Sequence, residues 1–169
     1  TAGFIWEDGA ITDLGTLDGS TRAYAINANR QVVGYSYSQE PGEHGSRAFR
    51  WEDGVMSDLG TLADEDYAEA FDINDAEEVV GSCWNHAGTQ LFAAHQATLW
   101  RADGEIVNLG PTPGPPVCQV GHPLYTSNIA RAINAHGQIV GHAQCISSGG
   151  ALAAFLWEDG VMYNLNDRI

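Results

Sequence analysis

The sequence contains no lysine, and its seven arginines stand against 22 acidic residues, which gives a formal net charge of −15. Such a chain repels the phosphates of nucleic acids and of anionic lipids, so we expect neither as a partner. It also lacks any apolar run near the roughly 20 residues that a membrane-spanning helix requires. We therefore expect no membrane insertion. Its three cysteines are too few for a disulfide scaffold.

Catalytic motifs are missing as well. The sequence has no Gly-x-Ser-x-Gly nucleophile motif, and no serine or cysteine has an evident histidine partner. We therefore expect no enzyme and name no catalytic residue. With 169 residues, 44% of them hydrophobic and 17% charged, the chain nevertheless has the size and composition of one folded domain.

An internal repeat organises the chain. A motif with a tryptophan before an Asp-Gly pair occurs four times, and each copy is followed by a short motif centred on Asp-Leu or Asn-Leu. A third motif, Ala-x-x-Ile-Asn, occurs three times, and a glycine stands seven residues after each of its asparagines. The copies are 4–9, 49–54, 98–104 and 155–160; 12–15, 57–60, 107–110 and 163–166; and 23–27, 70–74 and 130–134, with Gly34, Gly81 and Gly141.

Each repeat predicts four β-strands. Asp-Gly between two apolar runs is a strong signal for a two-residue hairpin turn, in which both turn residues have positive φ. The third motif and the strand that ends at its glycine supply the other two strands. The turn between them is cleanest as Asn134-Ala-His-Gly137; Arg30 and Glu77 replace that glycine, which predicts either mild strain or another geometry.

The whole chain, 1–169, is thus predicted to be a single repeat domain. Its units are about 3–47, 48–96 and 97–153, followed by a half unit at 154–169, which gives fourteen strands in all. We expect an all-β fold of propeller-like blades, with a β-trefoil-like barrel as the alternative. Closed propellers have four to eight blades, so three and a half blades do not close alone. We expect either that the sequence is an excerpt of a longer propeller, or that a homodimer or a larger assembly completes the ring.

These motifs resemble the HAF repeat of extracellular bacterial proteins, whose pattern is Ala-Phe-Leu-Trp-x-x-Gly, Asp-Leu-Gly-x-Leu, Ala-x-x-Ile-Asn and Gly-Gln-Val-Val-Gly. The resemblance covers essentially the whole chain, although the His-Ala-Phe triplet of the family name is intact in no copy. It implies an extracellular or periplasmic location, a repeated β-sheet architecture that resembles propeller blades, and no established activity or catalytic residue.

The residues that recur in each repeat are expected to build the core. One large aromatic in each unit suits the packing of neighbouring sheets, and Tyr24 and Phe71 share one register and are interpreted in the same way. Gly34, Gly81 and Gly141 mark positions where backbones approach too closely for a side chain. The recurring aromatics are Trp6, Trp51, Trp100 and Trp157.

The carboxylates Asp13 and Asp58 recur in the second strand, but the later copies have Asn108 and Asn164. A residue that becomes an amide in half of the copies is not acting as an acid or a base. We expect its side chain to accept a backbone hydrogen bond at the Leu-Gly turn.

Trp84 is the leading candidate for ligand binding, because it lies outside the repeat pattern and precedes Asn85 and His86. An exposed indole beside hydrogen-bonding groups suits the apolar face of a sugar ring. Tyr125 extends this candidate site. The alternative is that Trp84 covers the loop at 88–94.

The middle repeat is the most acidic, with eleven carboxylates and one arginine between residues 49 and 96. Clustered carboxylates suit Ca²⁺, which binds six to eight oxygen ligands. The Ca²⁺ candidates are Asp64, Asp66, Asp72 and Asp75, although no known calcium-loop motif is present. A solvated acidic face is the alternative, and no other cofactor is expected.

Cys118 and Cys145 flank two predicted strands in the third repeat. In an exported protein they are expected to form a disulfide. With His122 and His142 they could instead form a tetrahedral Zn²⁺ site, and free thiols are the third possibility.

The sequence thus predicts a non-catalytic, exported β-repeat module that binds a partner protein or a glycan at the cell surface. A carbohydrate-active enzyme and a structural subunit of an extracellular assembly are the alternatives.

Overall fold

The chain is all-β, and the computed structural model describes residues 2–38, 45–85, 95–110, 126–145 and 151–168. These ranges hold the fourteen strands expected from the repeats and one short 3-10 helix. In chain order they are β1 (Phe4–Glu7), β2 (Ala10–Asp13), β3 (Gly19–Ile26), β4 (Val32–Ser38), β5 (Gly45–Glu52), β6 (Val55–Asp58), β7 (Tyr67–Ile73), β8 (Val79–Trp84), β9 (Gln96–Trp100), β10 (Ile106–Asn108), β11 (Thr126–Ile133), β12 (Ile139–Cys145), β13 (Ala151–Glu158), β14 (Val161–Asn164) and η2 (Leu165–Arg168). No helix among the described residues is long and apolar enough to cross a membrane.

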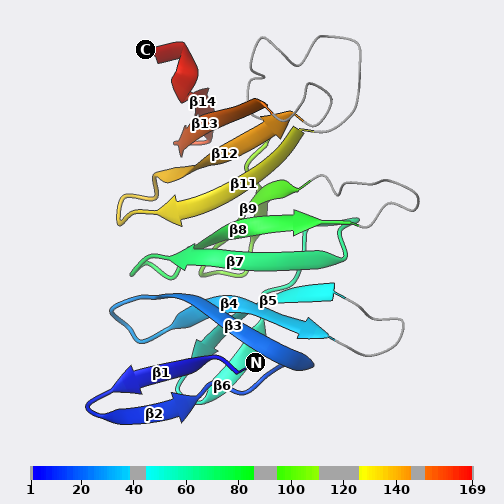
Figure 1. Ribbon diagram of the computed structural model, residues 1–169. Coiled ribbons are helices and arrows are strands. Elements are labelled where there is room, and N and C mark those ends of the chain that lie inside the picture. The colour runs from blue at the N-terminus through cyan, green and yellow to red at the C-terminus, as the bar shows by residue number, and fades with distance from the viewer. Residues whose placement is uncertain (1, 39–44, 86–94, 111–125, 146–150, 169) are drawn as a thin grey trace.

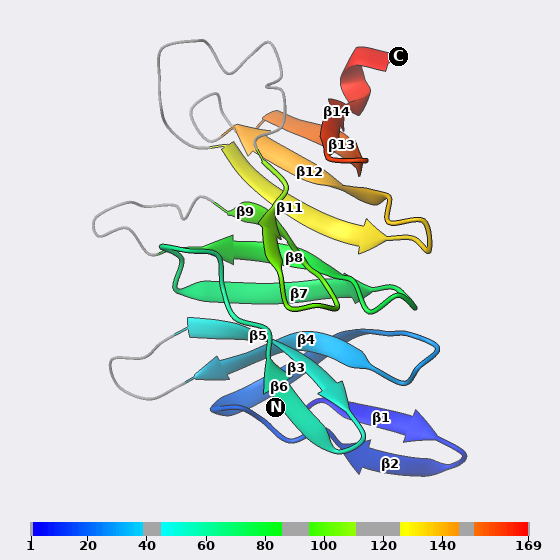
Figure 2. The same ribbon diagram turned by 180° about the vertical axis from the view of Figure 1, so that it is seen from behind.

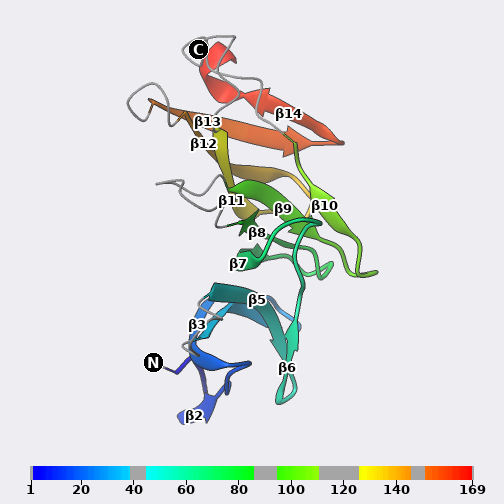
Figure 3. The same cartoon turned by 90° about the vertical axis from the view of Figure 1, so that its right-hand side faces the viewer.

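The strands form four antiparallel sheets that follow one another in a row (Figure 1; from behind, Figure 2). Sheet 1 is the pair β1–β2, and sheets 2, 3 and 4 are the meanders β3–β6, β7–β10 and β11–β14. The side view shows the sheets stacked between β2 and β14 (Figure 3). This arrangement confirms the blade-like prediction, and the described strands form no closed barrel of the trefoil type.

The sheets divide the repeat at a different point from the sequence units. Each four-stranded sheet begins with the two strands around Ala-x-x-Ile-Asn and ends with the tryptophan hairpin of the following sequence unit. The half sheet is therefore at residues 4–13, whereas the division by tryptophans places the half unit at 154–169. A repeat period alone does not fix where a sheet begins. Strand pairing does, because the Val-Val-Gly strand pairs on both of its edges.

The turns follow from the sequence. Asp8, Asp53 and Asp159 and the glycines after them all have positive φ, as the hairpin prediction requires. Arg30 and Glu77 have φ of 63° and 64°, close to the 74° of Gly137. The three Asn turns thus share one geometry, and the two non-glycine copies carry left-handed backbone strain.

Apolar clusters lie between neighbouring sheets, so no sheet forms a core by itself. The clusters hold, from sheet 1 to sheet 4, Leu14 with Phe49, Val33 with Ala70, and Leu99 with Phe155. Each repeat therefore depends on its neighbours for burial, as in other repeat proteins.

The second strand of each complete sheet (β4, β8 or β12) has a glycine at the point where the backbone of the first strand approaches most closely. A Cβ added to Gly34 or Gly81 would lie 1.9 Å from the carbonyl oxygen of Arg22 or Glu69 on the first strand. The equivalent distance from Gly141 to the oxygen of Ile129 is 2.0 Å. These distances are far inside van der Waals contact, so a side chain requires the strands to separate.

Gly81→Ala should therefore destabilise the protein by about 1–3 kcal/mol, the usual cost of overpacking a well-packed interior. The measurement is the midpoint of urea unfolding. Glu52→Gln, on the exposed end of β5, is the control and should leave the midpoint almost unchanged. A Gly81→Ala midpoint equal to that of the control would contradict the close approach.

Candidate functional site

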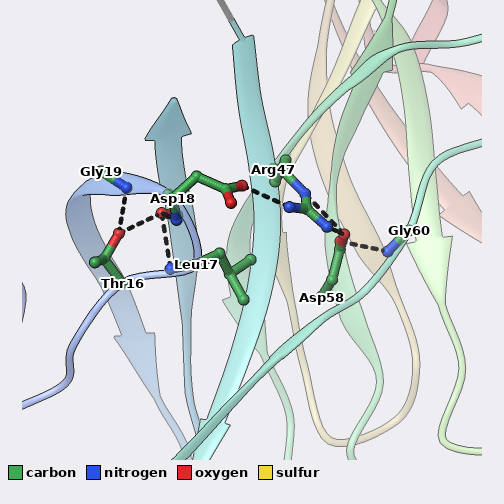
Figure 4. A network of polar contacts seen from close by, with 8 residues as sticks. Thr16, Leu17, Asp18, Gly19, Arg47, Asp58 and Gly60 are labelled. Carbon is green, nitrogen blue, oxygen red and sulfur yellow. Dashed lines mark hydrogen bonds and ion pairs between the residues drawn. The ribbon is translucent and has the colours of Figure 1, made fainter. Parts of the chain in front are cut away.

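The recurring Asp and Asn side chains at the Leu-Gly turns have the structural role expected of them. Asp58 Oδ1 accepts a hydrogen bond from the backbone N–H of Gly60 at 2.9 Å, and Asp13, Asn108 and Asn164 make the same bond two residues ahead. The guanidinium of Arg47 donates to the other carboxylate oxygen of Asp58, Oδ2, and also forms an ion pair with Asp18 (Figure 4). The prediction of a turn acceptor is confirmed, and these groups stabilise the backbone.

Trp84 lies within an aromatic cluster at the end of β8. Its ring stacks on the imidazole of His95, with centroids 4.5 Å apart, and lies 5.8 Å from the ring of Tyr67, its cross-strand partner. The indole is half-buried. The other members of the predicted ligand site, His86 and Tyr125, lie outside the described residues, as does the loop at 88–94 that Trp84 could cover.

His95 connects this cluster to the next sheet. Its Nδ1 lies 3.2 Å from Ser82 Oγ, its backbone N–H donates to Ser127 Oγ, and its carbonyl accepts from the N–H of Asn128 at 2.8 Å. Burial lowers the pKa of His95 to about 4, with a further contribution from the charge of Arg131. The imidazole is therefore neutral at pH 7 and acts as a packing and bridging group.

The Ca²⁺ candidates do not converge. Asp72 accepts a hydrogen bond from the backbone N–H of Ile133 at 2.9 Å, and Asp75 accepts one from Ala28 at 2.9 Å. Both carboxylates thus tie one sheet to the next. Asp64 and Asp66 lie in the loop before β7. Within the described ranges, no three acidic, imidazole or thiol groups gather as metal ligands would.

The predicted disulfide lies partly outside the described residues. Cys145 ends β12, but Cys118 and His122 fall in the range 111–125, so neither the disulfide nor the zinc alternative is placed. Cys83 is a buried free thiol in the cluster between sheets 2 and 3, and burial raises its pKa. It is a core residue.

A row of stacked side chains crosses the first strands of sheets 2, 3 and 4. Tyr24, Phe71 and Arg131 each occupy the position where the register shifts within these strands. The rings of Tyr24 and Phe71 lie 5.4 Å apart, and the guanidinium of Arg131 lies 4.4 Å from the centroid of Phe71. The expectation that Tyr24 is a core residue is wrong, because 47% of it is exposed at the end of this row.

The recurring tryptophans do not share one environment. Trp51 and Trp100 are buried, and Trp157 packs against the cluster between sheets 3 and 4. The indole N–H of Trp100 donates to the carbonyl of Gly60, in the loop that follows the last strand of sheet 2, at 3.1 Å. Each of these tryptophans therefore faces the sheet before its own. For Trp6 the core prediction is wrong: 65% of this residue is exposed, against 4% of Trp51.

Besides Trp6, three more residues are exposed although the equivalent residues of other repeats are buried. Phe4 is exposed, while Phe49 and Phe155 are fully buried. Ile26 is 55% exposed, while its equivalent Ile73 is 5% exposed. Ala23 is exposed as well, while Ala70 and Ala130 are fully buried. We call the four residues Phe4, Trp6, Ala23 and Ile26 the end face.

The end face is exposed because sheet 1 has two strands where the other sheets have four. A cleft of about 240 Å³ separates β1 from β3 and is lined by Phe4, Ile5, Trp6, residues 23–26 and Val32. The sequence analysis did not predict this surface, because equivalent residues of a repeat are expected to have equivalent surroundings. The half unit indicated that one sheet would be incomplete, but dividing the repeats at the tryptophans placed that half unit at residues 154–169.

Acidification should destabilise the protein through His95. The pKa of this imidazole is lowered to about 4 from 6.5, so between these values the unfolded chain binds a proton that the folded chain does not. The contribution of neutral His95 is complete above about pH 6.5 and is lost as the pH falls toward 4. Between pH 6.5 and pH 5, His95→Gln should lose less unfolding free energy than the wild type in urea titrations.

His136→Gln is the matched control for this pH measurement, because His136 lies in an exposed turn. It should lose as much stability as the wild type over the same interval. Equal losses for the His95→Gln and His136→Gln variants would contradict the burial of His95.

No protein-family model matches the chain, and neither a curated protein nor a solved structure matches it. The resemblance of its motifs to the HAF repeat stays a prediction.

Proposed function

We propose that the chain is a non-catalytic, exported β-repeat module that binds a partner protein through its end face. The observation that carries this proposal is the exposure of Phe4, Trp6 and Ile26 at positions where the other repeats bury the same residues. Contiguous apolar surface on a soluble protein marks an interaction site. Large aromatics within such a surface are typical of the residues that dominate protein–protein binding energy.

The surroundings of the end face also suit a protein partner. Arg30 and Glu7 form an exposed ion pair at 2.7 Å, and Glu7 directly follows Trp6 on β1. An apolar centre with a charged rim is the usual composition of a protein interface. The rim pair contributes little stability by itself because both side chains are more than half exposed.

A glycan fits this chain less well than a protein. Trp84, the indole expected to stack on a sugar, already stacks on His95. Trp6 is exposed, but it lines the cleft together with Phe4 and Ile26, and Tyr24 is the one other residue with a polar side-chain group among those that line it. Sugars need several hydrogen-bonding groups around the stacking ring.

Panning a phage library of random peptides against the immobilised protein, alongside a glycan array, tests the proposal. We expect peptides that bind the wild type and Trp84→Ala equally and lose at least tenfold in affinity with Trp6→Ser, because Trp6 is the largest exposed aromatic of the end face.

Val161→Ser is the matched control, since Val161 is a half-exposed apolar residue on sheet 4 at the other end of the row. It should leave peptide binding unchanged. Two outcomes would contradict the proposal: a glycan whose binding is lost with Trp84→Ala, or the absence of any peptide that distinguishes the wild type from Trp6→Ser.

A further inference from the structure

Two arginines of this acidic protein have no acidic partner. Arg22 and Arg131 are exposed, and within the described part of the chain their side chains form neither an ion pair nor a hydrogen bond. Four other described arginines do form ion pairs with carboxylates: Arg30, Arg47, Arg50 and Arg101. Since the chain has 22 acidic residues against seven arginines, a guanidinium without a carboxylate partner is unexpected.

Both of these guanidiniums lie on aromatic rings instead. Arg22 Cζ lies 5.9 Å from the ring centroid of Tyr35, and Arg131 Cζ lies 4.4 Å from that of Phe71. Tyr24 joins the two ends, since its ring centroid lies 5.8 Å from that of Tyr35 and 5.4 Å from that of Phe71. We call these five residues the cationic row.

The cationic row lies along the free edges of three sheets. β3, β7 and β11 each pair only with the second strand of their own sheet, and Figure 3 shows them on the side opposite β6, β10 and β14. The register shifts at Tyr24, Phe71 and Arg131. Such bulges re-aim a side chain and are common beside binding sites. All three sheets thus direct the same repeat position toward one surface.

One carboxylate lies near both ends of the row without neutralising it. Burial raises the pKa of Glu69, while the charge of Arg131, a hydrogen bond with Ser46 and the charge of Arg22 lower it. The carboxylate is therefore within electrostatic reach of both guanidiniums, but it forms an ion pair with neither. Two guanidiniums against one carboxylate leave the row locally positive on a chain whose net charge is −15.

A guanidinium that rests on a ring is prepared for a carboxylate. Stacking holds the planar group in place and leaves the N–H donors along its edge free, and these donors match the two oxygens of a carboxylate. Arg22 and Arg131 present two such groups at opposite ends of one row. The ligand that matches them has two carboxylates on one extended molecule.

A peptide segment fits the row better than a polyanion does. Nucleic acids and polyuronates have a negative charge on every unit, so the net charge of −15 repels them along their whole length. A peptide can place two acidic side chains among neutral residues, and its backbone can bond to the N–H and C=O groups at the free edges of the sheets. The rings also form no flat platform for a sugar, since the planes of Tyr24 and Phe71 are 53° apart and Arg131 lies over Phe71.

We propose that the cationic row binds an acidic peptide segment of a partner protein, with one carboxylate on Arg22 and another on Arg131. The segment crosses β3, β7 and β11, and the residues between its two carboxylates contact the rings of Tyr24 and Phe71. Tyr24 also lines the cleft beside the end face, but neither arginine does. The site is therefore separate from the end face and does not depend on the proposed function.

Fluorescence anisotropy of labelled peptides tests the inference. The peptides consist of glycine and serine with two glutamates separated by one to six residues, because each step of the row is 4.4 to 5.9 Å and an extended peptide advances about 3.3 Å per residue. At least one spacing should bind at least tenfold more tightly than the same peptide with both glutamates replaced by glutamine, because each carboxylate makes charge-assisted hydrogen bonds.

Matched variants of the protein locate the site. Arg22→Gln and Arg131→Gln should each weaken binding of that peptide at least tenfold. Arg101→Gln removes the same charge from an exposed turn outside the row and should leave the affinity unchanged. Arg131→Lys keeps the charge but lacks the planar group, so it should also weaken binding. Because all three positions are exposed, the urea midpoints of the variants should stay close to that of the wild type.

Three results would overturn the inference: no acidic peptide that binds better than its glutamine counterpart, equal affinity of the Arg131→Gln and Arg101→Gln variants, or an oligogalacturonate that binds more tightly than every peptide and is lost with Arg131→Gln. Trp6→Ser should leave the acidic peptide bound, because neither arginine of the row lines the cleft. Loss of the peptide with Trp6→Ser would place it at the end face and reject a separate site.

Discussion

The tryptophan hairpin of each repeat cannot bury its own apolar face, and the rest of the fold follows from this constraint. The aromatic side chains of the hairpin need an inner strand pair on one edge and a preceding sheet across the face. Where both are present, Trp51 and Trp100 are almost fully buried and Trp157 is half-buried. The tight contact of Gly34 and Gly81 with the neighbouring backbone holds the inner strands together closely enough for this packing.

Local signals in the sequence predicted much of this fold. The Asp-Gly pairs located the hairpins. Asp8, Asp53 and Asp159 and the glycines after them adopt the positive φ that two-residue turns require, whereas in the longer third turn only Gly104 of its Asp-Gly pair does. Substitution of Asp58 by Asn108 in a later repeat identified a turn acceptor, because both side chains offer the same oxygen to a backbone N–H. These features depend on a few neighbouring residues, and each copy of the repeat contains all of them.

Non-local features were harder to predict. A repeat has the same period wherever its first residue is placed, so pairing between Val32 and Trp51 was needed to locate the sheet boundary. Trp6 was therefore assigned to the core although its sheet has only two strands. The stacking of Trp84 on His95 was also not predictable, because it joins the end of β8 to the residue just before β9, and neither position belongs to the repeat pattern.

Amide hydrogen exchange of β1, compared with residues 49–52 of β5, tests most directly whether an inner strand pair is what protects each hairpin. The two segments have almost the same sequence, so differences in intrinsic exchange are small. If the account is correct, the amides of Phe4–Glu7 exchange at least tenfold faster than those of 49–52, since β5 is paired on both edges and β1 on one. Equal protection of the two segments would contradict it.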